Sequence, residues 1–279
     1  FGHGDDYYKS RQAILSNYSS NVWYGADLKP LKEHLFEVFD CLNCYPEPDA
    51  GSLRQLLAEV NHILPSEVLV TNGSITAFYL IAQTWAGKHS TIFTPSFAEY
   101  EDACRLHGHQ LSFFKNSSPL SALSFKGGGL CWICNPNNPD GKLISRSDMI
   151  GLIDSHPDTL FVIDQVYSDF CMEHLFDLED IHRYPNLILV QSISKLHKIP
   201  GVRIGYVAAS EDLISKIQPK LIPWSVNAFA IEAGKYTLQH PEQFCLPLQQ
   251  WLDESLRLQS QIRQLGIEVY PSSVPFFLM

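Results

Sequence analysis

The sequence SISKLHKIPGVRIGY, residues 192–206, places Lys195 after two serines, Ser192 and Ser194, and eight residues before Arg203. The apolar run at residues 187–190 leads into it and predicts a buried strand. Open α/β sheets bind ligands at the carboxyl ends of their strands, so this strand would direct an amine and two hydroxyl groups into such a crevice. That arrangement suits an amine that forms a Schiff base beside a bound phosphate. Taken alone, the motif more often marks a solvated loop lysine, and other parts of the chain decide between the two.

The rest of the chain alternates short apolar runs, which predict strands, with amphipathic segments, which predict helices. Expected strands are residues 67–71, 90–94, 109–114, 130–134, 160–164, 187–190 and 206–209, with a further strand starting at 267–270. Expected helices are residues 53–63, 74–86, 97–107, 145–154, 225–238 and 242–265. This alternation predicts an α/β fold, a mostly parallel sheet with helices on both faces.

Composition and charge exclude several classes of protein. The 279 residues are 45% hydrophobic and 18% charged, as in an ordinary globular protein. A formal net charge of −10 leaves no basic stripe for nucleic acid. The sequence contains no run of 18 apolar residues and nothing that resembles a signal peptide, so we expect a cytoplasmic protein without a membrane partner.

The seven cysteines include two CxxC pairs, Cys41 with Cys44 and Cys131 with Cys134. An odd and scattered set does not indicate a disulfide framework. Cys131 and Cys134 lie in the expected strand LCWIC, where residues three apart face opposite sides of a sheet. We therefore expect no metal site.

Two further strands end in polar groups. Asp164 closes the run TLFVID, and Tyr167 follows three residues later in DQVY. A carboxylate at that place would keep a ring nitrogen protonated, whereas a solvated strand-end aspartate is the alternative. The sequence NPNNPDG, residues 135–141, predicts a turn after another strand and brings Asn138 to the same edge of the sheet.

The strand at residues 67–71 is followed by Gly73, Ser74 and Ile75 at the start of an expected helix. Free N–H groups at a helix start, with the helix dipole behind them, form an anion site that a phosphate could use. An ordinary capped helix is the alternative. Phe97 in TPSFAEY and Tyr45 in CYPEPDAG stand beside expected turns, where core packing or a place on the rim is usual for an aromatic residue.

These motifs together resemble those of fold type I pyridoxal-phosphate (PLP) enzymes, in the branch that holds histidinol-phosphate aminotransferases and threonine-phosphate decarboxylases. The resemblance implies pyridoxal 5'-phosphate as cofactor, with Lys195 as the lysine that binds it covalently. It also implies that Ser192, Arg203 and the backbone of Ser74 and Ile75 hold the cofactor phosphate.

The same resemblance implies the partners of the cofactor ring. Asp164 would face the pyridine nitrogen, Asn138 and Tyr167 the phenolic oxygen, and Phe97 would stack on the ring. Tyr45 matches a tyrosine that reaches the cofactor phosphate of the other subunit, which implies a homodimer with shared active sites. The chain departs from the family pattern at Gln165, where glutamate is usual, and at Asp140, where threonine is usual; the added charge at Asp140 has no explanation in the sequence.

The resemblance also divides the chain. It implies a PLP-binding large domain at residues 41–240 and an N-terminal segment at residues 1–40 on the side of a smaller domain. Residues 241–279 would begin a C-terminal small domain. Family members continue through that domain, which supplies an arginine for the substrate carboxylate. We therefore expect most of it to be missing from this sequence, and this chain to be inactive without it.

Three stretches favour the decarboxylase branch: the start HGD with His3, the Ile-Pro pair at residues 199–200, and PWSVNAFA at residues 223–230. His3 and Asn21 match residues near the substrate. We expect decarboxylation of L-threonine O-3-phosphate to aminopropanol phosphate, as in cobalamin biosynthesis. The alternative is a histidinol-phosphate aminotransferase that passes the amino group to 2-oxoglutarate. A non-catalytic binding module of the same fold is a third hypothesis, against which the intact Lys195, Asp164 and Arg203 argue.

Overall fold

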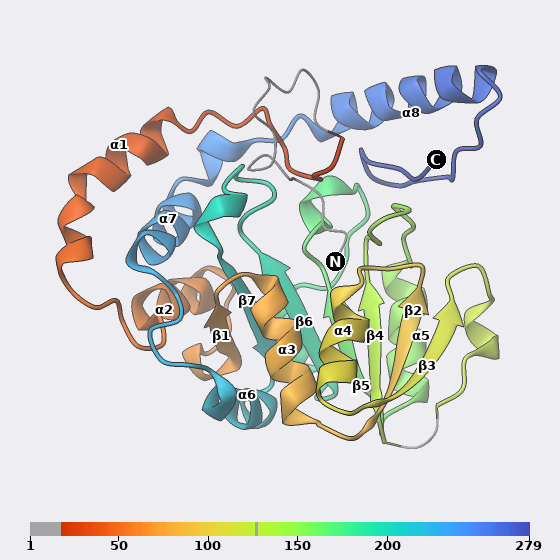
Figure 1. The fold of residues 1–279 in the computed structure, drawn as a ribbon, viewed down its shortest axis with the longest axis horizontal. Coiled ribbons are helices and arrows are strands. Elements are labelled where there is room, and N and C mark those ends of the chain that lie inside the picture. Colours follow the sequence, from red (N-terminus) through yellow and green to blue (C-terminus); the bar gives the residue numbers. More distant parts are fainter. Residues whose placement is uncertain (1–17, 126–127) are drawn as a thin grey trace.

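A computed structural model describes residues 18–125 and 128–279 of the chain. Its centre is a sheet of seven strands in the order β1-β7-β6-β5-β4-β2-β3 (Figure 1). The strands are β1 Val68–Thr71, β2 His89–Thr94, β3 Gln110–Lys115, β4 Leu130–Cys134, β5 Leu160–Asp164, β6 Leu187–Ser192 and β7 Gly205–Ala209. Each lies where a strand was expected, within two residues at either end.

The sheet is parallel from β3 through β2, β4 and β5 to β6, and antiparallel at the β6–β7 and β7–β1 pairs. The connection from β6 to β7 explains the change of direction. It contains no α-helix, only the short 3₁₀ turn Pro200–Val202, whereas a parallel neighbour is usually reached through a helix that crosses the sheet. The mostly parallel α/β fold expected from the sequence is confirmed.

Helices cover both faces of the sheet. The helices are α1 Lys29–Glu37, α2 Gly51–Val60, α3 Ser74–Thr84, α4 Glu99–Leu106, α5 Arg146–Ser155, α6 Glu211–Ile217, α7 Ala228–Gln239 and α8 Leu248–Gln264. Buried residues of α3, α4 and α6 form the core on one face, and those of α2, α5 and α7 belong to the core on the other. Figure 1 shows α3 and α4 in front of the strands and α5 behind them.

The inner strands β4, β5 and β6 are mostly apolar on both sides, as expected for strands that are covered on each face. β4 shows this at Cys131, which packs in the core with α5, and at Cys134, which packs in the core with α3 and α4. The two thiols of this CxxC pair therefore face opposite sides of the sheet, as expected for residues three apart in a strand. Among the described residues, no group of three or more histidine, cysteine or acidic side chains is placed to hold a metal ion.

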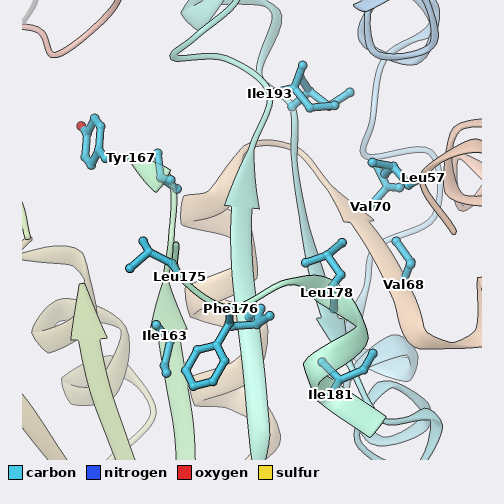
Figure 2. Close-up of a cluster of buried hydrophobic side chains, with 14 of the residues drawn as sticks. Leu57, Val68, Val70, Ile163, Tyr167, Leu175, Phe176, Leu178, Ile181 and Ile193 are labelled. Atoms are coloured by element: carbon cyan, nitrogen blue, oxygen red, sulfur yellow. The ribbon is translucent and has the colours of Figure 1, made fainter. Parts of the chain in front are cut away.

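The core beneath the site is built from the ends of β1, β5 and the segment after β5. Figure 2 shows Val68, Val70 and Ile163 together with Phe176, and places Tyr167 at the end toward which β5 points. Close packing of these side chains holds the strand ends rigidly, so polar groups placed there have defined positions. No helix in the described part of the chain has the length and apolar character needed to cross a membrane.

One expected element is wrong. Residues 267–270 form no strand; instead the Tyr270 amide donates to the carbonyl of Leu278 (2.9 Å), and the Ser273 amide donates to the carbonyl of Gly141 (2.9 Å). An apolar run becomes a strand only beside a partner strand, and in the described residues this segment lies against loops instead. The helix expected at residues 242–265 also begins later, at Leu248, because Pro241 and Pro247 interrupt its start.

Candidate active site

A cavity of about 620 Å³ opens where β4, β5 and β6 end. The last residue of each strand, Cys134, Asp164 and Ser192, contributes to its wall. Ten of the residues singled out in the sequence line this one cavity: Asn21, Ser74, Ile75, Phe97, Asn138, Asp164, Tyr167, Ser192, Lys195 and Arg203. The volume lies within the range of about 300–1,000 Å³ that is usual for small-molecule sites.

Lys195 projects into the cavity from the loop after β6. Its Nζ lies 5.8 Å from the centre of the Tyr167 ring, over the face of that ring. The Trp23 amide donates to the Lys195 carbonyl (3.1 Å), which ties the loop to the segment that carries Asn21. The residue is half-buried and lines the cavity.

The serines before Lys195 hold this loop against the start of β7. The hydroxyls of Ser192 and Ser194 both donate to the carbonyl of Ile204, at 3.3 and 3.2 Å. The Ser194 amide in turn donates to the Ser192 hydroxyl (3.2 Å). Of the two hydroxyl groups, that of Ser192 is the less buried, and both residues line the cavity.

Arg203 and the start of α3 meet at one end of the cavity. Gly73 has φ +78°, and a Cβ there would lie 2.2 Å from Nη2 of Arg203. The guanidinium therefore occupies the space that only a glycine leaves open. Arg203 itself has a left-handed backbone (φ 63°), and its Nη1 donates to the carbonyl of Pro200 (3.0 Å). Burial lowers the pKa of Arg203, yet a guanidinium remains charged at neutral pH.

The first turn of α3 approaches β7 closely beside Arg203. A Cβ on Gly205 would lie 2.5 Å from the amide nitrogen of Ser74, so only glycine fits between them. Gly73 stands at the N-cap position and supplies no side chain to the first-turn amides. Uncapped N–H groups and a guanidinium thus converge at this end, which is an arrangement that binds anions.

Asp164 stands at another part of the cavity wall, where β5 ends. Its Oδ2 accepts a hydrogen bond from the Tyr100 hydroxyl (2.5 Å), and its Oδ1 accepts one from the Val166 amide (2.9 Å). Burial raises the pKa of this carboxyl to about 6, opposed by the Tyr100 and Val166 hydrogen bonds and by the charge of Lys195. The carboxyl therefore titrates close to neutral pH, which is typical of functional acids.

Sequence reasoning missed Tyr100. It lies on α4 and is 1% exposed, and its ring packs edge-on against Phe97, which precedes the helix (5.8 Å between centroids). The residue type could have indicated a polar contact, because a tyrosine at a fully buried position needs a hydrogen-bond partner for its hydroxyl.

Asn138 and Tyr167 also line the cavity. The Asn21 side chain donates to Oδ1 of Asn138 (3.4 Å) and also hydrogen-bonds with Tyr167. Burial raises the pKa of the Tyr167 phenol, so the hydroxyl stays protonated and remains a donor. Asn21 thus joins the two residues that the resemblance assigns to a single oxygen atom.

The two departures from the family pattern serve the scaffold. The Asp140 carboxylate accepts from the Asn137 side chain (2.6 Å) and the Lys142 amide (3.0 Å), and it does not line the cavity. The Asp140 carboxylate therefore stabilises the turn at residues 135–141 through these hydrogen bonds. Gln165 is 1% exposed and pairs with the backbone of Phe176 through both ends of its amide.

Of the predicted residues that the structure describes, one lies away from this cavity. Tyr45 is 87% exposed and contacts the Trp224 ring at 5.9 Å between centroids. It is absent from the cavity wall, and its expected contact with another subunit stays a prediction. His3 lies outside the described residues.

Comparison with known proteins adds to this geometry. The family model described as aminotransferase class I and II matches residues 17–279. Among curated relatives, histidinol-phosphate aminotransferase 1 of Carboxydothermus hydrogenoformans is 31% identical, covering 84% of this chain and 69% of the relative. Threonine-phosphate decarboxylase of Salmonella typhimurium is 28% identical, covering 92% and 75% respectively.

Among solved structures, L-threonine-O-3-phosphate decarboxylase from Porphyromonas gingivalis superposes with a TM-score of 0.89. It is 44% identical in sequence, and the match covers 91% of this chain and 79% of that one. The chain is therefore similar to proteins of both reactions that the sequence suggested.

Proposed function

Because the chain belongs to the aminotransferase class I and II family, we propose that it decarboxylates L-threonine O-3-phosphate. It is a PLP-dependent enzyme, with pyridoxal 5'-phosphate as its cofactor. The observation that carries the choice of reaction is the 44% identity to a solved decarboxylase over 91% of the chain, against 31% to a histidinol-phosphate aminotransferase.

The anion end of the cavity fits the cofactor phosphate. Arg203 is half-buried, and among the described residues no carboxylate lies within ion-pair distance of it. A phosphate held there by Arg203, Ser192 and the first-turn amides of Ser74 and Ile75 would supply the missing negative charge. Gly73 keeps this cradle open, since any side chain at that position would displace the guanidinium.

The other end fits the pyridine ring. Asp164 would hold a proton at the ring nitrogen, because a carboxylate favours the charged form of a neighbouring base. Phe97 lines the cavity and packs edge-on against Tyr100 (5.8 Å between centroids), which fixes one wall for the ring. Asn138 and Tyr167 would donate to the phenolic oxygen.

When bound, PLP withdraws electrons from the substrate carbon that loses a carboxylate or a proton. The chain's own residues then decide which proton moves. Lys195 lies over the Tyr167 face, where its amine would deliver a proton to the substrate carbon after carbon dioxide leaves. Asn21 would orient the substrate from the same wall through its bond with Asn138.

The sequence around the cavity also supports decarboxylation. The Ile-Pro pair at residues 199–200 begins the turn that positions Arg203, and PWSVNAFA leads into α7. Both stretches resemble decarboxylases. The proposal includes a role in cobalamin biosynthesis, as that resemblance implies. Histidinol-phosphate aminotransferase is the second candidate, supported by the relative from Carboxydothermus hydrogenoformans.

We also propose that the active unit is a cytoplasmic homodimer. Tyr45 contacts the exposed Trp224 ring (5.9 Å between centroids), and exposed apolar side chains also come from α1, the 3₁₀ turn Phe39–Asn43 and the segment before α7. These are Phe36, Phe39, Leu42, Ile222 and Trp224, which are 49–74% exposed. A cluster of this kind is typical of a surface covered by a partner. A second copy seated there would bring its Tyr45 toward the cofactor phosphate of this chain.

The test of the reaction uses two substrates in parallel. The purified full-length protein with PLP receives O-phosphothreonine, or histidinol phosphate with 2-oxoglutarate. Release of carbon dioxide from the first supports the proposal, whereas glutamate from the second without carbon dioxide from the first overturns it. Lys195→Ala is the blank, and we expect its turnover to fall by more than about 10⁴-fold, since the covalent and proton-transfer roles are both lost.

The matched control is Lys198→Ala in the same loop. The Lys198 amine donates to the carbonyl of Ala26 (3.3 Å), away from the cavity. This variant should keep its turnover and its cofactor absorbance. If Lys195→Ala retained the long-wavelength absorbance of bound PLP and Lys198→Ala lost it, the assignment of the lysine would be wrong.

A further inference from the structure

The Tyr100 hydroxyl is the shortest polar contact of the Asp164 carboxylate, at 2.5 Å. The Tyr100 ring is fixed on three sides: it stacks with Trp132 (6.0 Å, 23°), and it stands edge-on to Phe78 (4.9 Å, 88°) and Phe97 (5.8 Å, 78°). A ring held in this way has one orientation, and that orientation directs its hydroxyl at the carboxylate.

Tyr100 also contacts two residues that line the cofactor cavity. Phe97, in the segment before α4, lines the cavity and packs edge-on against Tyr100, and Asp164 lines the cavity and accepts the Tyr100 hydrogen bond. Tyr100 itself does not line the cavity. It therefore acts on bound molecules only through its neighbours.

We propose that Tyr100 is a positioning residue that holds the Asp164 carboxylate ionised and aimed at the ring nitrogen of the cofactor. The phenol donates a neutral hydrogen bond to Oδ2, and the Val166 amide does the same for Oδ1. Both donors favour the charged carboxylate and leave its net charge uncancelled for a cationic ring. The inference rests on PLP being the cofactor and is independent of which substrate reacts.

The other groups that face Asp164 act differently. Cys134 at the end of β4 and Tyr167 after β5 are buried, and burial raises the pKa of both, so they stay neutral. Lys195 from the loop after β6 favours the carboxylate by its charge. That charge changes when Lys195 engages the cofactor, whereas the Tyr100 hydrogen bond stays in place.

The experiment compares Tyr100→Phe with Tyr236→Phe. Each removes one hydroxyl from a buried tyrosine. The hydroxyl of Tyr236 on α7 donates to Gln243 (2.9 Å) in the 3₁₀ turn Pro241–Phe244, and neither residue lines the cavity. PLP is titrated into each apoprotein from pH 5 to 9 and followed by cofactor absorbance and tryptophan fluorescence. For Tyr100→Phe we expect the Kd for PLP to rise about 10-fold at neutral pH, the size expected for a lost hydrogen bond to a charged group.

The pH profile separates positioning from packing. PLP affinity should fall as Asp164 takes up a proton, and in Tyr100→Phe that fall should begin at higher pH than in the unsubstituted protein and in Tyr236→Phe. An unchanged Kd and an unchanged profile in Tyr100→Phe would overturn the proposal. In an Asp164→Asn background, the Tyr100→Phe change should have no further effect on PLP affinity, because its route to the cofactor is gone.

If Tyr100→Phe fails to fold, the unsubstituted apoprotein still tests the idea. A slowly exchanging Tyr100 hydroxyl proton should appear far downfield in the NMR spectrum and vanish in Asp164→Ala, which removes the acceptor; its persistence there would contradict the bond. Should the unsubstituted protein bind no PLP, the proposed function fails, whereas PLP binding that ignores Tyr100→Phe defeats only the present inference.

Discussion

The two ends of the cavity bind charge in opposite ways. At the anion end, a guanidinium and uncapped helix amides converge on a space kept open by Gly73. At the ring end, one carboxylate is 5% exposed and relies on a phenol and one amide for its hydrogen bonds. The first end offers positive charge to a ligand, and the second holds a negative charge that the protein has removed from water.

This difference predicts which end of the cavity is destabilised when no cofactor is bound. The groups at the anion end are intrinsically charged or dipolar, so they are ready without a ligand and lose little when one is absent. The carboxylate at the ring end is destabilised by burial, which raises its pKa to about 6. A cationic ring relieves that strain, so cofactor binding should stabilise the ring end more than the anion end.

The largest effect should come from the pH dependence of apoprotein stability. The folded pKa of Asp164 is about 6 against an ordinary 3.8, so the stability contributed by its proton is fully present below pH 4 and is lost as pH rises through 6. Asp164→Asn stays neutral throughout. Relative to the unsubstituted apoprotein, it should gain on the order of 3 kcal/mol in free energy of unfolding between pH 4 and 7.

Urea denaturation of both apoproteins across that range measures the gain. The control is Asp212→Asn, which removes an exposed carboxylate paired with Lys216 on α6. A gain of the same size in Asp212→Asn, or a stability difference between Asp164→Asn and the unsubstituted apoprotein that does not change with pH, would show that the ring end stores no such strain. Saturation with PLP should reduce the gain, because the bound ring compensates the carboxylate.

The sequence was sufficient for much of this site because its motifs close consecutive strands. Asp164 and Ser192 end β5 and β6, and parallel neighbours bring their carboxyl ends to one edge. Local turn chemistry placed Asn138 there as well. The strand pattern and the parallel strand order were enough to predict that these residues lie close together.

What could not be predicted depends on contacts between distant segments. Tyr100 looks like any core aromatic of an amphipathic helix, and only the packing of α4 against β5 gives its hydroxyl a partner. Asp140 looked like a charge beside an anion site until the turn showed its carboxylate directed to Asn137. The expected strand at residues 267–270 failed because an apolar run does not specify whether a partner strand is adjacent.

A smaller effect is expected at the anion end. Arg203→Lys keeps the charge but loses the planar fork of donors, so the Kd for PLP should rise about 10- to 100-fold. Arg105→Lys on α4, where Arg105 pairs with exposed Glu101, is the control. The loss of PLP affinity in Arg203→Lys should vary little between pH 6 and 8, because a lysine and an arginine both stay charged there. The effects at the ring end, in contrast, should depend on pH. A rise below three-fold would mean that the helix amides alone hold the phosphate.

The smallest effect is expected from Tyr45, which would extend the anion end across a subunit interface. Tyr45→Phe keeps the contact with the Trp224 ring and removes one hydroxyl, so the Kd for PLP should rise about 3- to 10-fold, as for a single lost hydrogen bond. Tyr270→Phe, at another exposed tyrosine, is the control and should leave the Kd unchanged.

Mixed dimers decide whether the tyrosine acts on its own subunit or on the partner. A hybrid dimer contains one Lys195→Ala subunit and one Tyr45→Phe subunit. One of its two sites has the intact lysine of the Tyr45→Phe subunit. If sites are shared, the tyrosine of that site comes from the Lys195→Ala subunit and is also intact. If Tyr45 acts across the interface, that site should bind PLP with unaltered affinity. If the hybrid shows only the weakened affinity, Tyr45 acts within its own chain, and the anion end is complete in one subunit.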